Sequence, residues 1–570
     1  GNFLIIAYKE LRQLQHAIIG RIDELMPTGI GVKIPDNQLI NINNFYGIEI
    51  DDFAHELAVL SLFLAKHQMN QEFTEQFGKA LSIIPLIDIP TIVRGNAARL
   101  DWQEVCANRP HRLNPVEQLQ AALEIDDMEP IEQQEIFARY TYDEIYLIGN
   151  PPYKGSKLQT NDQKADFKAY FGDEEYSKNL DYIAIWFIKG ARYIAGTNAQ
   201  LAFVTTNSVS QGEHVGILFP KLFDEGVEIG FAYTSFKWQN SARDNAGVTV
   251  AIVSLRNESK ANKYLFADGI KNVAKNINAY LVDTDSSVIV YKSSKPISSV
   301  PTMTFGSMPI DEGNLILDAN GKRELEAVGG AQFIKNFIGS AEFLRGLQRW
   351  CIWITNETLK DAQSIPFIND RLEKVATFRT GSKRADTKKL AATPWSFGFV
   401  SYKPTNSIIM PSVSSERREY IPAGLLDATT VVSNLAFTIY NAEPWLFALL
   451  ESKIHTAWIR TVCGKLKTDY RYSSTLGYNT FPIRTLLETE KDVLNKSTRR
   501  ILLARAAHPE KTLADMYDPD KMPADLREAH EENDHLVDNL YKKGGFTNDE
   551  DRLAALFDLY EQMTAKEKTK

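Results

Sequence analysis

The chain has 570 residues, of which 44% are hydrophobic and 24% are charged, so it is long enough for several globular domains with separate cores. Its three cysteines, Cys106, Cys351 and Cys463, lie far apart and have no histidine or cysteine neighbours at metal-ligand spacing, which argues against a disulfide framework and a zinc site. The formal net charge of −9 gives no support for nucleic-acid binding, so that function would have to rest on locally basic surface.

Hydrophobic periodicity alternates between helix and strand along the first half of the chain. The segments that show it, in chain order, are a helix at 1–18, a strand at 43–52, a helix at 53–68, a strand at 144–149, a helix at 180–195, and strands at 199–206 and 247–255. Strands and helices that alternate in this way are typical of an α/β fold with a doubly wound, largely parallel sheet.

The pattern changes twice further along the chain. After about residue 257 short strand-like pieces are broken by proline and glycine, and after about residue 486 the sequence becomes helical and strongly charged. We therefore expect an α/β domain at 1–329, a mixed α+β domain at 330–485 and a helical domain at 486–570.

The residues that follow the strand at 144–149 indicate a ligand site. Ligands of doubly wound sheets bind outside the carboxyl ends of the strands, and Asn150 stands at such an end. Pro151 and Pro152 force a stiff extended loop, so backbone carbonyl oxygens lie beside the acceptor oxygen of Asn150. With the ring of Tyr153, these acceptors suit a planar ligand that carries an amino group, such as adenine. The alternative is a proline-stiffened turn in which Asn150 only caps backbone.

Four stretches, taken with their order and spacing, resemble successive motifs of the amino-group DNA methyltransferases that use S-adenosylmethionine. They are GNF at 1–3, YGIEIDD at 46–52, RGNAARLDW at 94–102 and LIGNPPY at 147–153. The wider chain is similar to the MmeI-like (Type IIL) family of single-chain restriction-modification enzymes, with LAFVTTNSVSQGE, RWCIWI, SSERREYIP and KLKTDYRYSSTLGYNTFPI as supporting stretches. In that family a nuclease precedes an adenine methyltransferase, a target-recognition domain and a helical tail.

The resemblance implies a methyltransferase domain at 1–329, a DNA target-recognition domain at 330–485 and a helical tail at 486–570. The chain departs from the family at its start, because the family's central strand and the rest of its glycine-rich loop should precede Gly1. We therefore expect the first strand of the methyltransferase sheet to be missing, between the strands that end at Glu49 and Asn150. On this expectation the chain alone binds its cofactor weakly and turns over little.

The resemblance also implies a site for S-adenosylmethionine. Glu49, at the carboxyl end of its strand, would accept both ribose hydroxyls, and Ile50 would lie on the adenine face. Asn96 matches the family position that contacts the adenine amino group, although RGN could equally form a turn. The residues that this chain retains from the glycine-rich motif are Gly1, Asn2 and Phe3.

A helix-entry role is the alternative for Glu49. Asp51 and Asp52 are the better candidates for that role, because they immediately precede the helix at 53–68.

The reaction implied by the family is direct transfer of the sulfonium methyl group to the amino nitrogen of a flipped adenine, without a metal or a strong base. Acceptors on Asn150 and Pro151 would draw the two amino hydrogens out of the ring plane and stabilise the developing charge. A flipped base needs stacking partners, which would be Tyr153 on one face and Phe236 or Trp238 on the other. The alternative for Phe236 and Trp238 is ordinary core packing, since alternate residues of one strand often bury together.

Basic clusters in the second half of the chain predict contact with double-stranded DNA. Residues 371–390 hold seven lysines and arginines against two acidic residues, although a single charge run is more often a solvated face. Two further clusters interleave cations with tyrosines or serines, and lysine and arginine attract phosphates while arginine also reads guanine. The candidate DNA-contact residues are Lys383, Arg384, Arg417, Arg418, Lys465, Lys467, Arg471 and Tyr472.

Two other classes of function fit the same motif. Asn-Pro-Pro-Tyr also occurs in methyltransferases that act on RNA or on a protein glutamine, and a defence-complex subunit could keep the fold without catalysis. No apolar run is long enough to cross a bilayer, and no membrane partner is expected. We expect a protein of the prokaryotic cytoplasm.

Overall fold

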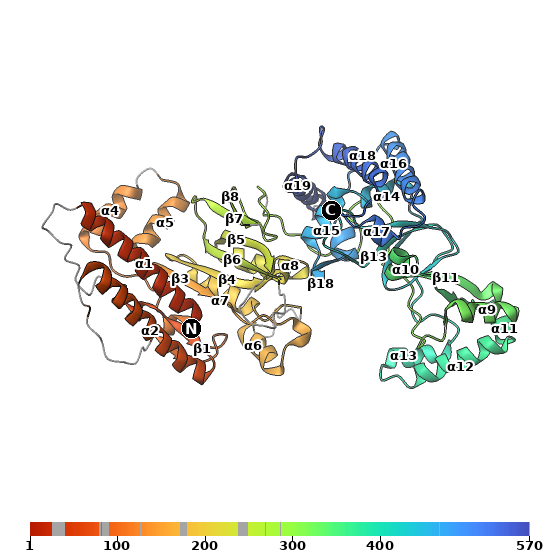
Figure 1. Ribbon diagram of the computed structural model, residues 1–570, viewed down its shortest axis with the longest axis horizontal. Coiled ribbons are helices and arrows are strands. Elements are labelled where there is room, and N and C mark those ends of the chain that lie inside the picture. The colour runs from red at the N-terminus through yellow and green to blue at the C-terminus, as the bar shows by residue number, and fades with distance from the viewer. Residues whose placement is uncertain are drawn as a thin grey trace. The chain divides into compact units, whose positions relative to one another are not determined.

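The computed structural model describes residues 1–25, 40–78, 81, 91–125, 128–171, 179–237, 249–267, 269–285, 287–466 and 468–568. The chain forms two compact units, which consist of residues 1–209 with 217–274 and of residues 210–216 with 275–570 (Figure 1).

The first unit begins with two helices packed on a small parallel sheet. Its elements are α1 (Asn2–Leu25), η2 (Ile42–Asn44), β1 (Gly47–Glu49), α2 (Asp52–Phe77) and β2 (Ile92–Arg94). β1 and β2 pair in parallel, from Gly47 opposite Ile92 to Glu49 opposite Arg94. Apolar residues from both helices, from the segment before β1 and from the start of β2 share one core, including Tyr8, Leu62 and Met69. The expected order of helix, strand and helix is confirmed.

A six-stranded sheet forms the rest of the framework of the first unit. Its strands, in spatial order, are β3 (Ile145–Gly149), β4 (Ala199–Thr206), β6 (Thr249–Asn257), β5 (Val227–Lys237), β7 (Lys263–Ala267) and β8 (Ile270–Ala274). β3 and β4 run parallel, as expected for a doubly wound sheet, but β6 is inserted antiparallel between β4 and β5. The α/β class is confirmed, and the antiparallel strand is a feature that the sequence pattern did not predict.

Helix α7 (Ala184–Ile194) is a buried helix that packs on β4. Nearly all of its residues are buried, as in a helix that is apolar all round. At Gly190 a Cβ atom would lie 2.5 Å from Leu201, so glycine allows this helix to lie directly on β4. The other helices of the chain before β5 are α3 (Trp102–Val105), α4 (Pro115–Ile125), α5 (Pro130–Thr141), α6 (Asn161–Phe171) and α8 (Glu213–Phe223).

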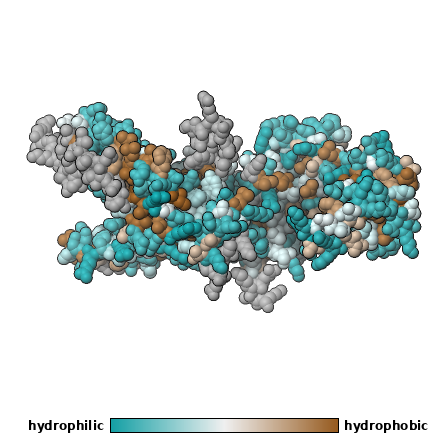
Figure 2. Space-filling view, turned by 90° about the horizontal axis from the view of Figure 1, so that it is seen from below, coloured by the Kyte–Doolittle hydropathy of each residue, from teal (hydrophilic) through white to brown (hydrophobic). Residues whose placement is uncertain are grey.

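β1 and β3, whose carboxyl ends lead into the candidate site, each have an open edge. Within the described ranges, β1 pairs with β2 alone and β3 pairs with β4 alone. Apolar side chains are exposed beside these edges and on the neighbouring helices, and brown atoms gather on this unit at the left of Figure 2. They include Tyr146 and Ile148 on β3, Leu14, Ile18 and Ile22 on α1, and Phe53, Leu57, Leu60 and Leu64 on α2. A strand between β1 and β3 stays a prediction.

The second unit contains three small sheets. The first, in spatial order, has β10 (Ile316–Leu317), β12 (Trp350–Ile352), β11 (Ile334–Ile338) and β16 (Val431–Val432). The second has β15 (Gly424–Leu426), β13 (Ser407–Pro411), β17 (Ala436–Tyr440) and β9 (Met303–Phe305), and the third has β14 (Val413–Ser414), β19 (Asp469–Arg471) and β18 (Lys465–Leu466). β9 and β10 belong to these sheets, although both precede residue 329. The division between the two units therefore falls after Ala274, earlier than the domain boundary expected at 329.

Helices dominate the remainder of the second unit. Those that precede the helical tail are α9 (Ala319–Ala327), α10 (Ser340–Arg345), α11 (Leu359–Gln363), α12 (Pro366–Thr380), α13 (Ala385–Lys389), α14 (Pro444–Leu450) and α15 (Lys453–Val462). The tail contains α16 (Glu488–Ala506), α17 (Leu513–Met516), α18 (Ala524–Tyr541) and α19 (Asp549–Lys568), which confirms the predicted helical region. None of the helices in the described ranges has the length and hydropathy needed to span a bilayer.

A buried polar network joins the tail to the end of α14. Glu451, after α14, is fully buried and lies 2.6 Å from the guanidinium of Arg505 on α16. The Tyr517 hydroxyl donates to the same carboxylate at 3.1 Å, and His530 on α18 lies 2.6 Å from that hydroxyl. Breaking such a buried pair leaves an uncompensated charge, so these residues hold the tail against the end of α14.

Candidate active site and DNA-contact residues

The loop that follows β3 leaves its acceptor groups open. Asn150 is exposed, Pro151 is buried, and Tyr153 is 37% exposed. Among the described residues nothing is hydrogen-bonded to the Asn150 side chain, and no backbone N–H donates to the carbonyl of Pro151. The side chain therefore does not cap a turn, and the acceptors that the sequence predicted remain available to a ligand.

The backbone after Tyr153 is held by buried side chains from the segment before α7. Lys154 N–H donates to the Asp181 carboxylate at 2.8 Å, and Tyr182 N–H donates to the Lys154 carbonyl at 3.1 Å. The Gln159 side chain donates to the Lys154 and Leu180 carbonyls, both at 3.0 Å. Asp181 and Gln159 are each 6% exposed, so these bonds form away from water and stiffen the loop.

Glu49 lies at the carboxyl end of β1, beside the loop after β2. Its Oε1 accepts the Ile50 N–H at 3.0 Å, and its carbonyl accepts the Gly95 N–H at 2.8 Å. Asp51 is the N-cap of α2, because its side chain accepts the Ala54 N–H at 2.8 Å. Glu49 therefore does not cap the helix, and Asp51 does, as the sequence indicated.

The residues present fit the adenosine end of S-adenosylmethionine. Oε2 of Glu49 has no hydrogen bond within the part of the chain that the structure describes, so it is open to a ribose diol. Ile50 is 67% exposed and offers an apolar face for a ring. Gly1 lies where a Cβ atom would be 2.9 Å from Ala58 of α2, and Asn2 begins α1. Phe3, in the first turn of α1, is 41% exposed.

Asn96 forms a turn. Its Oδ1 accepts the Ala98 N–H at 2.9 Å, and its carbonyl accepts the N–H groups of Arg99 and Leu100. The turn interpretation is therefore confirmed for the backbone. The Asn96 Nδ2 group lies 3.4 Å from Asp166, so a contact with the cofactor's adenine stays a prediction.

Asp166 on α6 connects this turn to the segment behind the Asn-Pro-Pro-Tyr loop. Its two carboxylate oxygens accept from Arg99 Nε and from the Tyr182 hydroxyl, each at 2.6 Å. Asp166 is 6% exposed. Burial, together with this hydrogen bond, raises the pKa of Tyr182, so the phenol stays protonated and remains a donor. One carboxylate thus links the turn at Asn96 to the segment that binds the backbone of Lys154.

Lys189 on α7 holds the same turn from another side. Its Nζ donates to the carbonyls of Ala97, Ala98 and Leu100, at 3.0, 3.2 and 2.6 Å, and lies over the Trp102 ring. These bonds use all three ammonium hydrogens. Burial lowers the pKa of Lys189.

The candidate stacking residues are only partly described. Phe236 lies near the end of β5, opposite Val250 of β6, and is half-buried, so both the stacking and the packing interpretations stay open. Trp238 lies outside the described residues.

Lys383 and Arg384 are exposed immediately before α13, and the described contacts include no ion pair for either. Two other cations of the 371–390 cluster are structural. Arg379 is fully buried and donates to five carbonyls, while Arg371 donates to the Asn314 carbonyl and packs on Phe367. Only part of that basic run is therefore free to meet DNA.

The segment at 416–420 is tied to the helical tail. Arg417 pairs with Asp520 and lies 4.0 Å from Asp518, whereas Arg418 is half-buried, which lowers its pKa. Arg460 Nη2 donates to the Arg418 carbonyl at 2.7 Å. These cations hold the segment in place, and a role in DNA contact remains a proposal for both arginines.

The β18–β19 hairpin contains a cluster of cations around one ring. Lys465 Nζ and the Arg460 guanidinium lie 5.2 and 5.4 Å from the centroid of Tyr470. Arg471 is exposed, and Lys467 lies outside the described residues.

The prediction that Tyr472 contacts DNA is wrong. Tyr472 is 4% exposed, and its hydroxyl is hydrogen-bonded to His455 at 3.0 Å, so it is a core residue with no surface to offer DNA.

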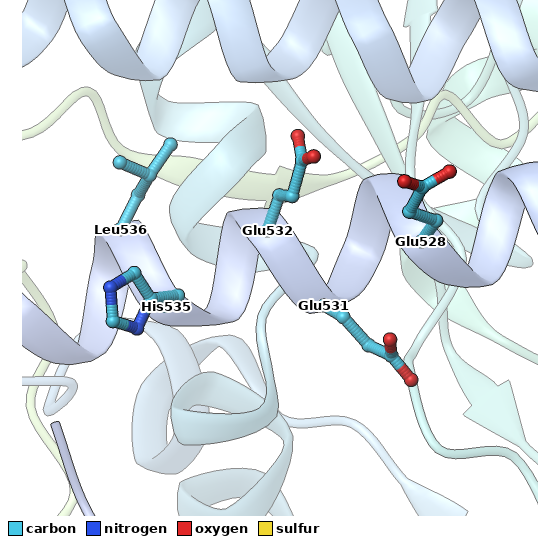
Figure 3. Close-up of a pocket in the computed structure, with 5 residues that line it drawn as sticks. All are labelled: Glu528, Glu531, Glu532, His535 and Leu536. Carbon is cyan, nitrogen blue, oxygen red and sulfur yellow. The ribbon is translucent and has the colours of Figure 1, made fainter.

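Two hollows in the structure lie away from these groups. One, on α18, is lined by Glu528, Glu531, Glu532, His535 and Leu536 (Figure 3). Its carboxylates would repel DNA phosphates. The other, of about 230 Å³, lies at the start of β4, at the opposite end of the strand pair from Asn150. The described residues contain no group of three or more His, Cys, Asp or Glu side chains that could hold a metal ion.

Several residues of the site have weak sequence signals. Asp181 and Tyr182 interrupt an apolar run just before α7, which is the one local hint of a buried polar contact. Asp166, Lys189 and Arg460 have no such hint, because their partners are more than 40 residues away along the chain or on another element.

Three family models match the chain in order. They describe the MmeI DNA-methyltransferase domain at residues 1–267, the MmeI target recognition domain at 284–485 and the MmeI C-terminal domain at 487–567. A curated relative from Bacillus subtilis (strain 168), named DNA methyltransferase A, is 42% identical over 572 residues and matches 99% of this chain. The chain spans 60% of that relative's length.

A solved structure is similar over nearly the whole chain. It is that of the Type IIL restriction-modification enzyme MmeI in complex with DNA, with a TM-score of 0.80 and 34% sequence identity. The match covers 99% of this chain and 72% of that one. Together with the ordered domain matches, this similarity shows that the chain belongs to the MmeI family.

Proposed function

We propose that the protein transfers a methyl group from S-adenosylmethionine to the N6 atom of an adenine in double-stranded DNA, as part of a restriction-modification protein. The observation that carries this proposal is the Asn150 side chain, which stands exposed and without a hydrogen bond in the described structure at the carboxyl end of β3. The family relationship and the MmeI–DNA structure support DNA as the partner.

The chain's own groups would act on the adenine amino group. When bound, S-adenosylmethionine supplies an electrophilic methyl group. Asn150 Oδ1 and the Pro151 carbonyl would accept the two amino hydrogens, which directs the nitrogen lone pair toward that methyl group and stabilises positive charge as it develops. The ring of Tyr153, open to solvent, would stack on one face of the base. Glu49 and Ile50 would hold the cofactor's ribose and adenine.

Sequence recognition would lie in the second unit. Lys383 and Arg384 are exposed there without ion pairs among the described residues, which leaves them free to meet phosphates or base edges. Lys465 and Arg471 are further candidates, and Arg417 and Arg418 would contribute from the segment held by the tail. Since chromosomal and entering DNA are the substrates of restriction-modification, we place the protein in the prokaryotic cytoplasm.

The test offers duplex DNA, RNA and a protein extract in parallel to the native protein that contains this chain, with S-adenosylmethionine labelled on its methyl group. The product nucleosides are then identified by mass spectrometry. N6-methyladenine in duplex DNA supports the proposal. Label in RNA or protein, or in N4-methylcytosine, would assign the same loop to another amino or amide substrate, and no transfer to any of them would indicate a non-catalytic subunit.

A further inference from the structure

The loop after Asn-Pro-Pro-Tyr presents an apolar tip that follows two cations. Leu158 is 72% exposed, and Lys154 and Lys157, which precede it in the same loop, are also exposed. The described residues include no ion pair for either lysine. A single exposed leucine is ordinary on a protein surface, so its significance depends on how it is held and on what lies beside it.

The tip is held rigidly. Residues 156–158 form the short helix η3 (Ser156–Leu158), and the Leu158 N–H donates to the Gly155 carbonyl at 2.8 Å. On one side of the tip the backbone of Lys154 is bound by Asp181, and on the other side Gln159 is 6% exposed and bound to two carbonyls. Leu158 is therefore exposed on a loop that is anchored at Lys154 and at buried Gln159.

The tip is also close to the site along the chain. Leu158 is the fifth residue after Tyr153, a reach of at most about 18 Å even for fully extended chain. An adenine that binds at Asn150 and Tyr153 has left the base stack, and unstacking a base costs free energy that an inserted apolar side chain can offset. Leu158 has the chemistry to fill that gap, and the two lysines have the charge to hold the phosphates beside it.

We propose that Leu158 inserts into the DNA duplex at the position vacated by the flipped adenine, while Lys154 and Lys157 contact the flanking phosphates. This inference rests on the proposed adenine methyltransferase function. It assigns to Leu158 a role in base flipping, distinct from binding of the flipped base by Asn150 and Tyr153.

The test compares Leu158→Ala with the wild type on two substrates, using the native protein. One substrate is an intact duplex, and in the other the target adenine faces an abasic site, where the base is already weakly held. We expect Leu158→Ala to methylate the intact duplex at least tenfold more slowly and the abasic duplex within about threefold of wild type. Leu158→Met, which keeps an apolar tip, should retain most activity on both substrates.

The control is Leu123→Ala on α4, another leucine that is 71% exposed and lies away from the loop. It should behave as wild type. A fluorescent 2-aminopurine at the target position gives a second readout, because its emission rises when it leaves the stack. At saturating protein, Leu158→Ala should show a smaller rise than wild type.

The outcomes separate this inference from the proposed function. If the wild type methylates no adenine in DNA, the proposed function fails. If the wild type methylates both duplexes and Leu158→Ala matches it on both, Leu158 does not assist flipping. An equal loss on both duplexes would also overturn the inference, because it would place Leu158 in general DNA binding or in the stability of the loop.

Discussion

The Tyr182 hydroxyl donates to the buried carboxylate of Asp166 at 2.6 Å, and the other oxygen of that carboxylate accepts from Arg99. Tyr182 also donates its backbone N–H to Lys154, directly after Asn-Pro-Pro-Tyr. Asp166 therefore lies between the turn at Asn96, predicted to meet the cofactor, and the loop predicted to meet the target base. Two ligand sites that share one hydrogen-bonded carboxylate should influence one another.

Removing the hydroxyl of Tyr182 should therefore weaken cofactor binding, although Tyr182 belongs to the target-base side. We expect Tyr182→Phe to lower kcat/KM for S-adenosylmethionine by at least about tenfold, through a higher KM and a lower kcat, because the loss of one hydrogen bond to a charged group costs about 1.5–3 kcal/mol. Steady-state kinetics with each substrate varied in turn measure both parameters. Tyr170→Phe on α6, whose hydroxyl accepts from Arg192, is the matched control. If Tyr182→Phe lowers the stability of the protein but leaves the KM for S-adenosylmethionine unchanged, Tyr182 contributes to packing alone.

The exposed cations before α13 should separate two kinds of DNA contact. Lys383→Ala should weaken binding to all DNA sequences. It should also reduce the slope of log affinity against log salt concentration by about one, as expected when one phosphate contact is lost. Arg384→Ala should relax preference at one base pair, at a cost of about 1–3 kcal/mol, as expected for an arginine that reads guanine. The readouts are binding isotherms at several salt concentrations and methylation of a randomised target library.

The control for these variants is Lys374→Ala on α12, because Lys374 is already paired with Asp370 at 2.7 Å. It should leave both readouts unchanged. Unchanged affinity and specificity in both the Lys383 and the Arg384 variants would place the recognition surface elsewhere.

The carboxyl of Asp534 should give the second unit a pH-dependent stability. Burial raises its pKa to about 6, against the opposing effects of Lys453 and the Tyr420 hydroxyl. As pH rises from about 4 to 6, the unfolded chain loses this proton first, so the contribution of Asp534 to the free energy of unfolding falls. Asp534→Asn removes that contribution. The wild type should therefore lose melting temperature relative to Asp534→Asn between pH 4 and 6, with no further relative loss above pH 7.

Asp162→Asn, at an exposed position on α6, serves as the control for this pH series. Its melting temperature should follow that of the wild type at every pH. Parallel curves for Asp534→Asn and the wild type would show that this carboxyl titrates alike in the folded and unfolded chain.

The open edges of β1 and β3 predict that an added strand strengthens cofactor binding. A longer form of the protein, with residues that pair between these strands, would satisfy backbone groups that each cost about 1–3 kcal/mol when buried without partners. Calorimetric titration of S-adenosylmethionine into both forms tests this, and equal affinity would show that the site needs no such strand.

Local sequence features predicted the parts of the site that depend on one segment. Asn150 could be located because a short apolar strand and two prolines determine the course of its loop, and Asp51 because helix N-caps have a strong local preference. The same reasoning did not predict Asp166. Its partners, Asn96 and Tyr182, lie 70 and 16 residues away, so only the packing of α6 beside two other segments brings them together.

Charge runs were the least reliable guide. Arg379 looks like the other cations of its run, but α12 turns it inward to a set of carbonyls. Tyr472 directly follows exposed Arg471, the last residue of β19, yet it is buried and hydrogen-bonded to His455. The sequence pattern also could not predict that β6 runs antiparallel to β4. Hydrophobic periodicity indicates which residues of a strand are buried, but it does not indicate the direction of the strand.

The most direct test of the proposed methyltransferase chemistry is the rate of N6-methyladenine formation in duplex DNA by the native protein and by its Asn150→Ala variant. DNA affinity is measured on the same preparations. Because the Asn150 acceptor would act on the transition state more than on the bound substrate, the variant should bind DNA within about twofold of wild type and methylate it at least about 10²-fold more slowly. A variant that binds and methylates DNA within a fewfold of wild type would contradict the assignment of Asn150 as the catalytic acceptor.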